Sequence, residues 1–534
     1  MKNRWIRAGV ALLAGLAVWT AAMEAASAAD ATTLHRGTSG EPGSIDPQRI
    51  NGVWEQVVVI DLFLGLTTDD AHGHVIPGLA KTWTVSADKT RYTFKLRDDV
   101  KWTDGTPVTA EDAVFGLRRA LDPATATPSA SLLYVIKNGA AVNTGKMPVD
   151  KIGVSAPDSH TVVIDLTSPT PYFLALLTNP VTYPAPKHVI DKYGKDWIKP
   201  AHIVTDGAYK FVDWVPQGHI TAAKNPGFYD AKNVHIPRVV YDFTEDRSTA
   251  LRRFRAGEID INNDVPVDQI PWLKANMPGA LHLTPYLATY YYVFNMSKPP
   301  FNDKRVRLAL SMLVERDVIT DKIIRVGDIP AFGVVPPNTA NYDGPAVKPP
   351  FADMGMAERV KKARELLTEA GYGPGFPLHV TLRYNTSDNH KKIATAIAAM
   401  WKRAGVLTDL ENADVAVHYA ALREGDFEIA RAGWVADYND PQNFLALFSD
   451  KTWTINYSRY NDPAFDKLMN EAANTADLTA RSAILHKAEA MAIDDAPVLP
   501  IYFYVSKNLV STRVKGWLDN AEDIHPTRYL SLQP

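Results

Sequence analysis

The sequence contains no cysteine in its 534 residues. This absence excludes a disulfide framework, a thiolate metal site, a cysteine nucleophile and a lipid-modified N-terminal cysteine. The hydrolase motifs G-x-S-x-G and H-E-x-x-H are missing too, and the glycine-containing segment GTSGEPGS matches neither phosphate-binding pattern. Because scattered carboxylates alone are a poor argument for catalysis, we expect a protein that is not an enzyme.

No charge of either sign dominates the chain. Lysine and arginine total 57 against 60 aspartate and glutamate residues, which gives a net charge of -3. Without a basic face or an arginine-rich run, we expect neither nucleic acid nor an anionic membrane surface as a partner. A chain of this length with 46% hydrophobic residues can bury a large core and suggests two to four domains.

A membrane-spanning helix needs about 18 consecutive apolar residues. Beyond the N-terminal region, the sequence has no apolar run of that length. Residues 1–28 have the pattern of a secretory signal peptide, with three basic residues, an apolar run over 8–22 and the cleavage pattern Ala26-Ser27-Ala28. An uncleaved signal anchor is the alternative. Export without an anchor or a lipid-modified cysteine predicts a free protein in a bacterial periplasm.

One cluster resembles a set of metal ligands. Asp69, Asp70, His72 and His74 lie within six residues. A hairpin loop rich in Asp, His and Gly explains the same residues, and we favour that interpretation and expect no metal. No cofactor is predicted from any other motif.

Helical and strand patterns alternate through the chain, which predicts an α/β fold with mixed sheets. Alternating apolar residues in RYTFKL and the β-prone LHLTPYLATYYYVFN predict strands. Thr109 and Asp112 form a capping-box pair before a helix. Asn302 or Asp303 can cap a second helix, PFNDKRVRLALSMLVERDVI, whose basic residues we expect to form a solvated face. The apolar segment 57–60 predicts a buried element.

The segment RAGWVADYNDP, residues 431–441, has the most informative pattern. Strand alternation over this segment places Arg431, Gly433, Val435 and Asp437 on one face. Six strand steps span roughly 20 Å, and an arginine side chain with two salt bridges takes up about 10 Å of that. About 10 Å remains, which is the length of an extended peptide of roughly three residues. On this pattern alone, a site for a zwitterion and a pair of structural ion pairs are equally good explanations.

Several strings together resemble the periplasmic oligopeptide-binding proteins of ABC importers, the large peptide and nickel solute-binding family. In chain order these strings are DGTPVTAEDAV, IVTDGAYK, PFNDKRVRLAL, YNTSDNHKK, RAGWVADYNDP and DPAFDKLMNEA. The resemblance runs from about residue 34 to the C-terminus. Relatives in this family bind dipeptides, murein peptides, glutathione, nickel chelates or haem.

The resemblance implies an α/β fold of two lobes that close over a ligand, with a third domain inserted in the first lobe. By matching strings, the first lobe comprises 29–63, 187–287 and 504–534. The inserted domain is 64–186 and the second lobe is 288–503. The chain crosses between lobes near Ala288 and Tyr504, where we expect the hinge.

The same resemblance assigns roles to individual residues. Asp437 is the anchor for the peptide ammonium, Arg431 meets the carboxylate of a tripeptide, and His390 serves longer peptides. Gly433 and Val435 pair with the ligand backbone, which gives affinity without reading side chains. Two further ligand-contacting residues are Val53, which pairs with the ligand backbone from the other lobe, and Trp434, which borders a side-chain pocket.

This sequence departs from the family pattern at several positions. Ile324 replaces a lysine that binds dipeptide carboxylates, and the neighbouring Arg325 is a substitute. Ser129 replaces a tyrosine, Asn51 an acidic pocket residue and Val415 a pocket tryptophan. The charged anchors are retained while the pocket walls change.

We therefore expect a monomeric receptor that captures short extended peptides and delivers them to an ABC permease in the inner membrane. The alternative within the same fold is another cargo: a murein peptide, a nickel chelate or haem. A secreted hydrolase and a purely structural envelope protein are the other classes; the first lacks its motifs, and the second leaves the charges of 431–437 unexplained.

Overall fold

The computed structural model describes residues 32–533 except 51, 264 and 450–454. The predicted signal peptide and Asn51 lie outside the described residues. Within the described part of the chain, no helix is long and apolar enough to cross a membrane.

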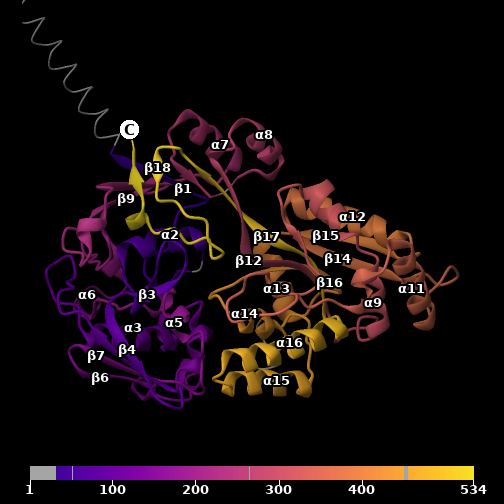
Figure 1. The fold of residues 1–534 in the computed structure, drawn as a ribbon, viewed down its shortest axis with the longest axis horizontal. Helices are drawn as coiled ribbons and strands as arrows, with labels where there is room; N and C mark the ends of the chain where they lie inside the picture. Colours follow the sequence, from indigo (N-terminus) through magenta and orange to yellow (C-terminus); the bar gives the residue numbers. More distant parts are fainter. Residues whose placement is uncertain (1–31, 51, 264, 450–454, 534) are drawn as a thin grey trace, which may run out of the picture.

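A mixed sheet of 11 strands runs through the described molecule. Figure 1 shows two masses, one built mainly from the N-terminal half of the chain and one from the C-terminal half, with β12 and β17 running between them. In spatial order the strands are β15 (Leu407–Ala413), β14 (His379–Asn385), β16 (Ile429–Val435), β12 (Leu281–Phe294), β17 (Val498–Val510), β11 (Ile261–Asn262), β1 (Thr33–Thr38), β10 (Arg238–Phe243), β9 (His219–Lys224) and β8 (Tyr209–Val215), with β13 (Ile329–Pro330) paired to β17.

Parallel and antiparallel pairs both occur in this sheet. β14 is parallel to β15 and β16, and β1 is parallel to β10 and β11. β12 is antiparallel to both of its neighbours, β16 and β17. The prediction of an α/β fold with mixed sheets is therefore confirmed.

Smaller sheets belong to the N-terminal mass and the C-terminal segment. The four-stranded sheet has the order β4 (Ala80–Val85), β5 (Arg91–Leu96), β7 (Thr161–Asp165) and β6 (Val154–Asp158). Two further pairs are β2 (Thr67–Asp69) with β3 (Val75–Pro77), and β18 (Val514–Lys515) with β19 (Ser531–Leu532).

The helices cover these sheets on both masses (Figure 1). Those of the N-terminal half are α2 (Val53–Leu62), α3 (Ala110–Leu121), α4 (Gly139–Asn143), α5 (Phe173–Leu176), α6 (Lys187–Tyr193), α7 (Arg247–Ala256) and α8 (Ile270–Asn276). Those of the C-terminal half are α9 (Lys304–Met312), α10 (Arg316–Val318), α11 (Met356–Glu369), α12 (Asp388–Lys402), α13 (Val415–Glu424), α14 (Pro441–Leu445), α15 (Pro463–Asn474) and α16 (Leu478–Asp495).

Most of the predicted elements form where the residue pattern places them. The capping box before α3 is present, with the Thr109 N–H donating to Asp112 Oδ2 at 2.9 Å. Asp303 caps α9 by accepting from the Arg305 N–H at 2.9 Å. The apolar segment 57–60 is part of helix α2, and Val58 and Val59 are fully buried in it.

The expected solvated face of α9 is wrong at Arg307, whose side chain is 3% exposed. Its guanidinium donates to the backbone carbonyls of Phe301, Asp495 and Ala496 at 2.6–3.2 Å. A buried arginine satisfied by carbonyls holds the C-terminal end of α16 against α9. Residue type alone does not reveal these partners, because the carbonyls of Asp495 and Ala496 are 188 and 189 residues away in the sequence.

The crossings expected at Ala288 and Tyr504 fall inside the two long strands β12 and β17. The pairing of these strands shifts register between Pro285 and Thr289. Ala288 and Tyr504 therefore lie at an irregularity of an otherwise continuous ladder rather than in loops. The domain borders and the hinge itself stay predictions.

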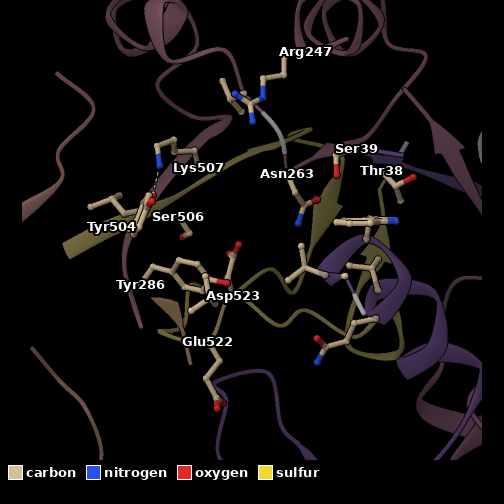
Figure 2. A pocket seen from close by; sticks show the side chains of 18 of the residues that line it. Thr38, Ser39, Arg247, Asn263, Tyr286, Tyr504, Ser506, Lys507, Glu522 and Asp523 are labelled. Atoms are coloured by element: carbon tan, nitrogen blue, oxygen red, sulfur yellow. Dashed lines mark hydrogen bonds between the residues drawn. The ribbon is translucent and has the colours of Figure 1, made fainter. Parts of the chain in front are cut away.

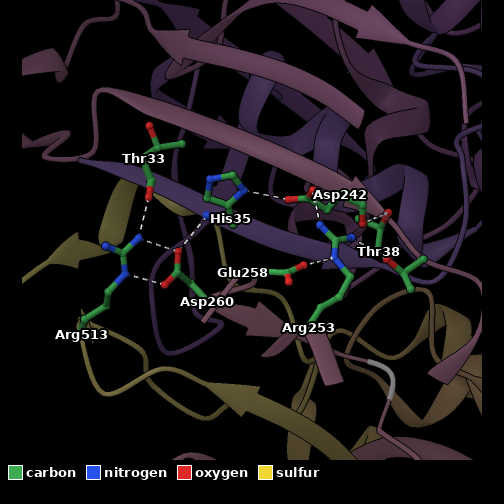
Figure 3. Close-up of polar contacts among 9 residues, drawn as sticks. Thr33, His35, Thr38, Asp242, Arg253, Glu258, Asp260 and Arg513 are labelled. Atoms are coloured by element: carbon green, nitrogen blue, oxygen red, sulfur yellow. Dashed lines mark hydrogen bonds and ion pairs between the residues drawn. The ribbon is translucent and has the colours of Figure 1, made fainter. Parts of the chain in front are cut away.

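Ion pairs fasten the C-terminal segment to strand β1 (Figure 3). Arg513 donates to both carboxylate oxygens of Asp260 at 2.5 and 2.9 Å and to the Thr33 carbonyl at 2.7 Å. Asp260 also accepts from the His35 N–H at 2.9 Å. On the other side of β1, Arg253 pairs with Asp242 at 2.8 Å, and Asp242 in turn meets the His35 ring. These contacts hold β1, β10 and the chain end as one unit.

A buried ion pair fixes the chain directly after β16. Asp440 is fully buried, and Arg481 of α16 donates to its two carboxylate oxygens at 2.7 and 2.8 Å. Asp440 also caps α14 by accepting from the Gln442 N–H at 3.0 Å. The bidentate Arg481–Asp440 pair therefore fixes the position of the chain just after the segment that carries Asp437.

We predict that Arg481→Met destabilises the protein by about 3–5 kcal/mol, because it leaves the Asp440 carboxylate buried without a cation. Urea unfolding followed by fluorescence measures the change. The matched control is Lys187→Met, which removes the exposed Lys187–Asp191 pair and should cost under about 1 kcal/mol. Equal losses in the two variants would contradict the prediction.

Candidate functional site

One edge of strand β16 is paired with a neighbouring strand along only part of its length. The strand pairs with β12 over Ile429–Val435, whereas its pairing with β14 stops after Ala430. The Ala436 N–H donates to the Leu287 carbonyl of β12. In this part of β16, the backbone N–H and C=O groups of even-numbered residues therefore point toward β12, and those of odd-numbered residues point away from it. The carbonyl of Arg431 accepts from His418 Nε2 at 2.8 Å. The backbone groups of Gly433 and Val435 consequently form an open strand edge.

A cavity of about 1280 Å³ lies along this edge. Its wall comes from distant parts of the chain, among them the end of β1, helix α2, residues 178–181, residues 385–390, Arg431, residues 435–437, strand β17 and residues 522–525. In Figure 2, Arg247 and Lys507 lie at one side of this space and Glu522 and Asp523 at the other. Side chains of both charge signs therefore line the cavity.

Arg431 places a buried cation in the cavity wall, because its side chain is 8% exposed. Neutral oxygens hold the guanidinium: Nη2 donates to the Tyr504 hydroxyl at 2.8 Å, and Nη1 donates to the Tyr419 hydroxyl at 3.1 Å and to Asn385 Oδ1 at 3.2 Å. The Tyr290 ring lies 4.8 Å from the guanidinium carbon.

No carboxylate of the described residues pairs with Arg431, and its Nε has no hydrogen-bond partner in that part of the chain. A buried charge without a counterion is costly, so such an arrangement is stable only where neutral dipoles or a ligand compensate it. The guanidinium is thus oriented in advance for an anion that enters the cavity.

Asp437 has the complementary arrangement two residues beyond the end of β16. It lines the cavity, and its polar contacts are with one amide: the Asp437 N–H donates to Asn443 Oδ1 at 3.3 Å and Asn443 Nδ2 lies 3.5 Å from Asp437 Oδ2. Burial raises the pKa of Asp437 to about 6, and the Asn443 contact opposes this shift. Within the described chain no Lys, Arg or His forms an ion pair with it.

His390 lies in the same cavity as a neutral ring. Burial, followed by the positive charge of Arg431, lowers the pKa of His390 to about 2. Its Nδ1 lies 3.3 Å from the Tyr290 hydroxyl. At neutral pH it can donate or accept a hydrogen bond but adds no charge.

The structure brings Arg431, Asp437, His390, Val435 and Val53 to one cavity. Val53 is the first residue of helix α2 and is 58% exposed, so any backbone hydrogen bond from it would come from a free helix-start N–H rather than from a strand. The pairing of Val53 with the ligand backbone stays a prediction.

Gly433 and Trp434 lie beside the cavity rather than in its lining. Trp434 points to the other face of β16 and donates through Nε1 to Asn443 Oδ1 at 2.7 Å, the same amide that contacts Asp437. A Cβ at Gly433 would lie 2.9 Å from Arg431 Nη2 and 3.1 Å from the Tyr504 hydroxyl. Glycine at this position therefore leaves room for the guanidinium.

Arg325 is not brought to the other predicted residues. It is exposed with φ of 61°, ends the helical turn Ile319–Ile324 and does not line the cavity, whereas Ile324 does. Ser129 also lines the cavity. Val415 is 52% exposed at the start of α13 and lies outside the lining.

Several residues that shape the site were missed from the sequence. Tyr504, Tyr419 and Asn385 orient Arg431 from three separate elements. Asn443 contacts Asp437 and Trp434. The tyrosine-rich run of β12 was the one available signal, since Tyr290 contacts both Arg431 and His390.

Asp69, Asp70, His72 and His74, the cluster that resembles a set of metal ligands, belong to the hairpin of β2 and β3. Asp70 Oδ1 accepts from the N–H groups of His72 and His74 at 2.8 and 2.9 Å, as in an Asx turn. Across the described residues, no group of three or more potential ligands is placed to hold a metal ion.

Comparison with known proteins identifies the family. The profile described as "Bacterial extracellular solute-binding proteins, family 5 Middle" matches residues 74–456. This chain belongs to the family 5 extracellular solute-binding proteins. Members of this family are binding receptors, and their two-lobed α/β fold is the fold of this protein.

Individual members of the family resemble the whole chain. The "Periplasmic oligopeptide-binding protein OppA" of Salmonella typhimurium is 42% identical over 525 residues, covering 97% of this chain and 96% of that protein. The "Periplasmic murein peptide-binding protein MppA" of Escherichia coli is 38% identical over 504 residues, covering 94% and 93%. The structure of Haemophilus influenzae OppA in complex with the peptide RPPGFSPFR has a TM-score of 0.82 at 35% identity, covering 94% of this chain and 99% of that one.

We predict that Gly433→Ala weakens trialanine binding at least roughly tenfold, or about 1.4 kcal/mol, because the new Cβ displaces the Arg431 guanidinium or the Tyr504 hydroxyl. Calorimetric titration measures the affinity. Gly373→Ala is the matched control, since a Cβ there meets nothing within 4 Å. An unchanged affinity in the folded Gly433→Ala variant would contradict this role.

Asp437 also predicts a pH dependence. A carboxylate binds an ammonium, so affinity falls as pH decreases through the pKa of about 6 and Asp437 becomes protonated. At pH 5 the affinity should be about tenfold below its value at pH 7. Burial also raises the pKa values of Asp69 and Glu522, but both groups are present in wild type and in Asp437→Asn, so the difference between the two profiles isolates Asp437. Parallel profiles would rule out this assignment.

Proposed function

We propose that this protein is a receptor that captures short peptides in extended form between its two lobes. The peptide ammonium pairs with Asp437, and the carboxylate of a peptide of about three residues pairs with Arg431. Gly433 and Val435 bond to the peptide backbone along the open edge of β16. The single observation that carries this proposal is the pair of opposite, uncompensated charges at one cavity beside a free strand edge.

The energetics favour a zwitterion over a neutral ligand. Lobe closure removes water from Arg431 and Asp437, which costs free energy unless each charge gains a counterion. A peptide supplies both counterions at once, separated by its own length. The backbone contacts through Gly433 and Val435 do not depend on side chains, so they suit a receptor for peptides of many sequences.

The remaining expectations about this receptor are part of the same proposal. It is a monomer, is exported to the periplasm by residues 1–28 without a lipid anchor, and delivers its cargo to an ABC permease without catalysing a reaction. The periplasmic names of its relatives and the family membership support this assignment. Recovery of intact peptide after incubation tests the absence of catalysis.

A murein peptide is the second candidate cargo, since one relative at 38% identity is named for that ligand. Nickel chelates and haem fit less well, because neither needs an ammonium anchor like Asp437. Native mass spectrometry of protein purified from its own periplasm identifies a trapped ligand and separates these cargoes by mass.

We predict that Asp437→Asn weakens trialanine binding at least roughly tenfold, about 1.4 kcal/mol, because the ammonium loses the charge of its carboxylate partner. Calorimetry measures the affinity, and circular dichroism checks that the variant is folded. Asp426→Asn, which changes an exposed carboxylate before β16, is the matched control and should bind as wild type. Equal affinities for Asp437→Asn and the control would contradict the assignment of Asp437 as the ammonium anchor.

A further inference from the structure

Tyr438 belongs to the C-terminal half of the chain but packs in the core of the N-terminal mass. Its side chain is 7% exposed, and the other buried members of its hydrophobic cluster come from residues 34–261 and 510–530. Figure 1 shows α5 of the N-terminal mass facing α14 of the C-terminal mass, and Tyr438 lies just before α14 in the chain. The segment between β16 and α14 therefore joins the two masses.

The partner of Tyr438 in the N-terminal mass is Tyr172, the residue before α5. Their rings are stacked, with centroids 4.5 Å apart and planes 4° from parallel. In the C-terminal mass, the Arg481 guanidinium carbon lies 5.7 Å from the Tyr172 ring, and the Tyr438 hydroxyl donates to Gln442 Oε1 at 2.5 Å. Stacked rings attract one another beyond the area they bury, so Tyr438 is held from both masses.

Asp437 is the residue next to this stack, and its own side chain makes only long contacts. The Asp437 N–H lies 3.3 Å from Asn443 Oδ1, and its Oδ2 lies 3.5 Å from Asn443 Nδ2. Strand β16 already ends at Val435, and the next ion pair along the chain is that of Asp440. Tyr438 is therefore the firmly held residue nearest to Asp437 in the chain.

Neither tyrosine lines the cavity, so a peptide bound there does not touch them. An effect of Tyr172 on peptide binding must then pass through Tyr438 to the segment that carries Asp437. A charged anchor binds well only if neighbouring side chains hold its position to about half an ångström. Because Tyr172 and Asp437 belong to different masses, this support is complete only while the two masses are in contact.

We propose that Tyr172 is a positioning residue for the ammonium anchor: through the stacked Tyr438 ring, it holds Asp437 where a peptide ammonium meets it. This inference rests on the proposed peptide-binding function and adds a coupling to it. The N-terminal mass takes part in recognition of the peptide ammonium without touching it, so that this anchor is complete only when the lobes have closed.

The test compares a ligand that uses Asp437 with one that does not. Affinities of trialanine and N-acetyl-trialanine are measured by calorimetry for wild type and Tyr172→Ala, because acetylation removes the ammonium and leaves the carboxylate unchanged. We expect Tyr172→Ala to weaken trialanine binding at least roughly fivefold and N-acetyl-trialanine binding by less than about twofold. A purely structural role of Tyr172 would lower both affinities by the same factor.

Further variants separate the ring stack from a general loss of stability. Tyr172→Phe keeps the ring and should bind both peptides as wild type does. The matched control is Tyr193→Ala, which removes a tyrosine that also packs on the N-terminal core and stacks on His202 with centroids 3.8 Å apart. It should leave both affinities unchanged. Circular dichroism checks that each variant is folded, and Tyr172→Leu, which is apolar but has no planar ring, takes the place of a Tyr172→Ala variant that does not fold.

Three outcomes would overturn the positioning role while leaving the proposed peptide binding intact. They are equal losses for the two peptides in Tyr172→Ala, no loss for either peptide, and a loss in Tyr172→Phe as large as that in Tyr172→Ala. Wild-type protein that binds trialanine and N-acetyl-trialanine equally well, or binds neither, would instead overturn the proposed ammonium anchor and this inference with it.

Discussion

The site depends on a buried arginine, Arg431, which the described residues orient but do not pair with a carboxylate. Arg431 is held by two phenol oxygens and one amide oxygen at 2.8–3.2 Å, and each is a dipole rather than a counterion. Dipoles fix the direction of the guanidinium while leaving its charge available, whereas a carboxylate partner would have neutralised it. Gly433 has a direct part in this arrangement because a side chain there would occupy the space of the guanidinium. Pre-orientation of this kind reduces what the ligand must order when it binds.

The position of Asp437 follows from the same segment of chain. Strand β16 ends at Val435, and the fully buried Asp440–Arg481 pair fixes the exit of the chain a few residues later. Tyr438, directly after Asp437, stacks on Tyr172 of the N-terminal mass with ring centroids 4.5 Å apart. Asp437 therefore lies where the two masses meet, while Arg431 lies on the strand itself. In the proposed function, this placement couples lobe closure to recognition of the two peptide ends.

Much of the fold and the charged part of the site could be predicted from local pattern. Strand alternation placed Arg431 and Asp437 at one cavity, and cap residues such as Thr109 and Asp303 marked helix starts correctly. The local sequence pattern did not predict contacts between residues that are far apart in the sequence. The residues that orient Arg431 come from β14, α13 and β17, and the buried state of Arg307 depends on carbonyls at the end of α16.

In the proposed function, the two ends of a peptide, rather than its side chains, make the main electrostatic contacts with Asp437 and Arg431. The most direct measurement removes the charges from the ligand and leaves the protein unchanged. Calorimetric affinities of trialanine, N-acetyl-trialanine and trialanine amide should show a loss of at least roughly tenfold, about 1.4 kcal/mol, for each capped end. Capped and free peptides that bind with equal affinity would contradict the assignment of Asp437 and Arg431 as anchors for the two ends of the peptide.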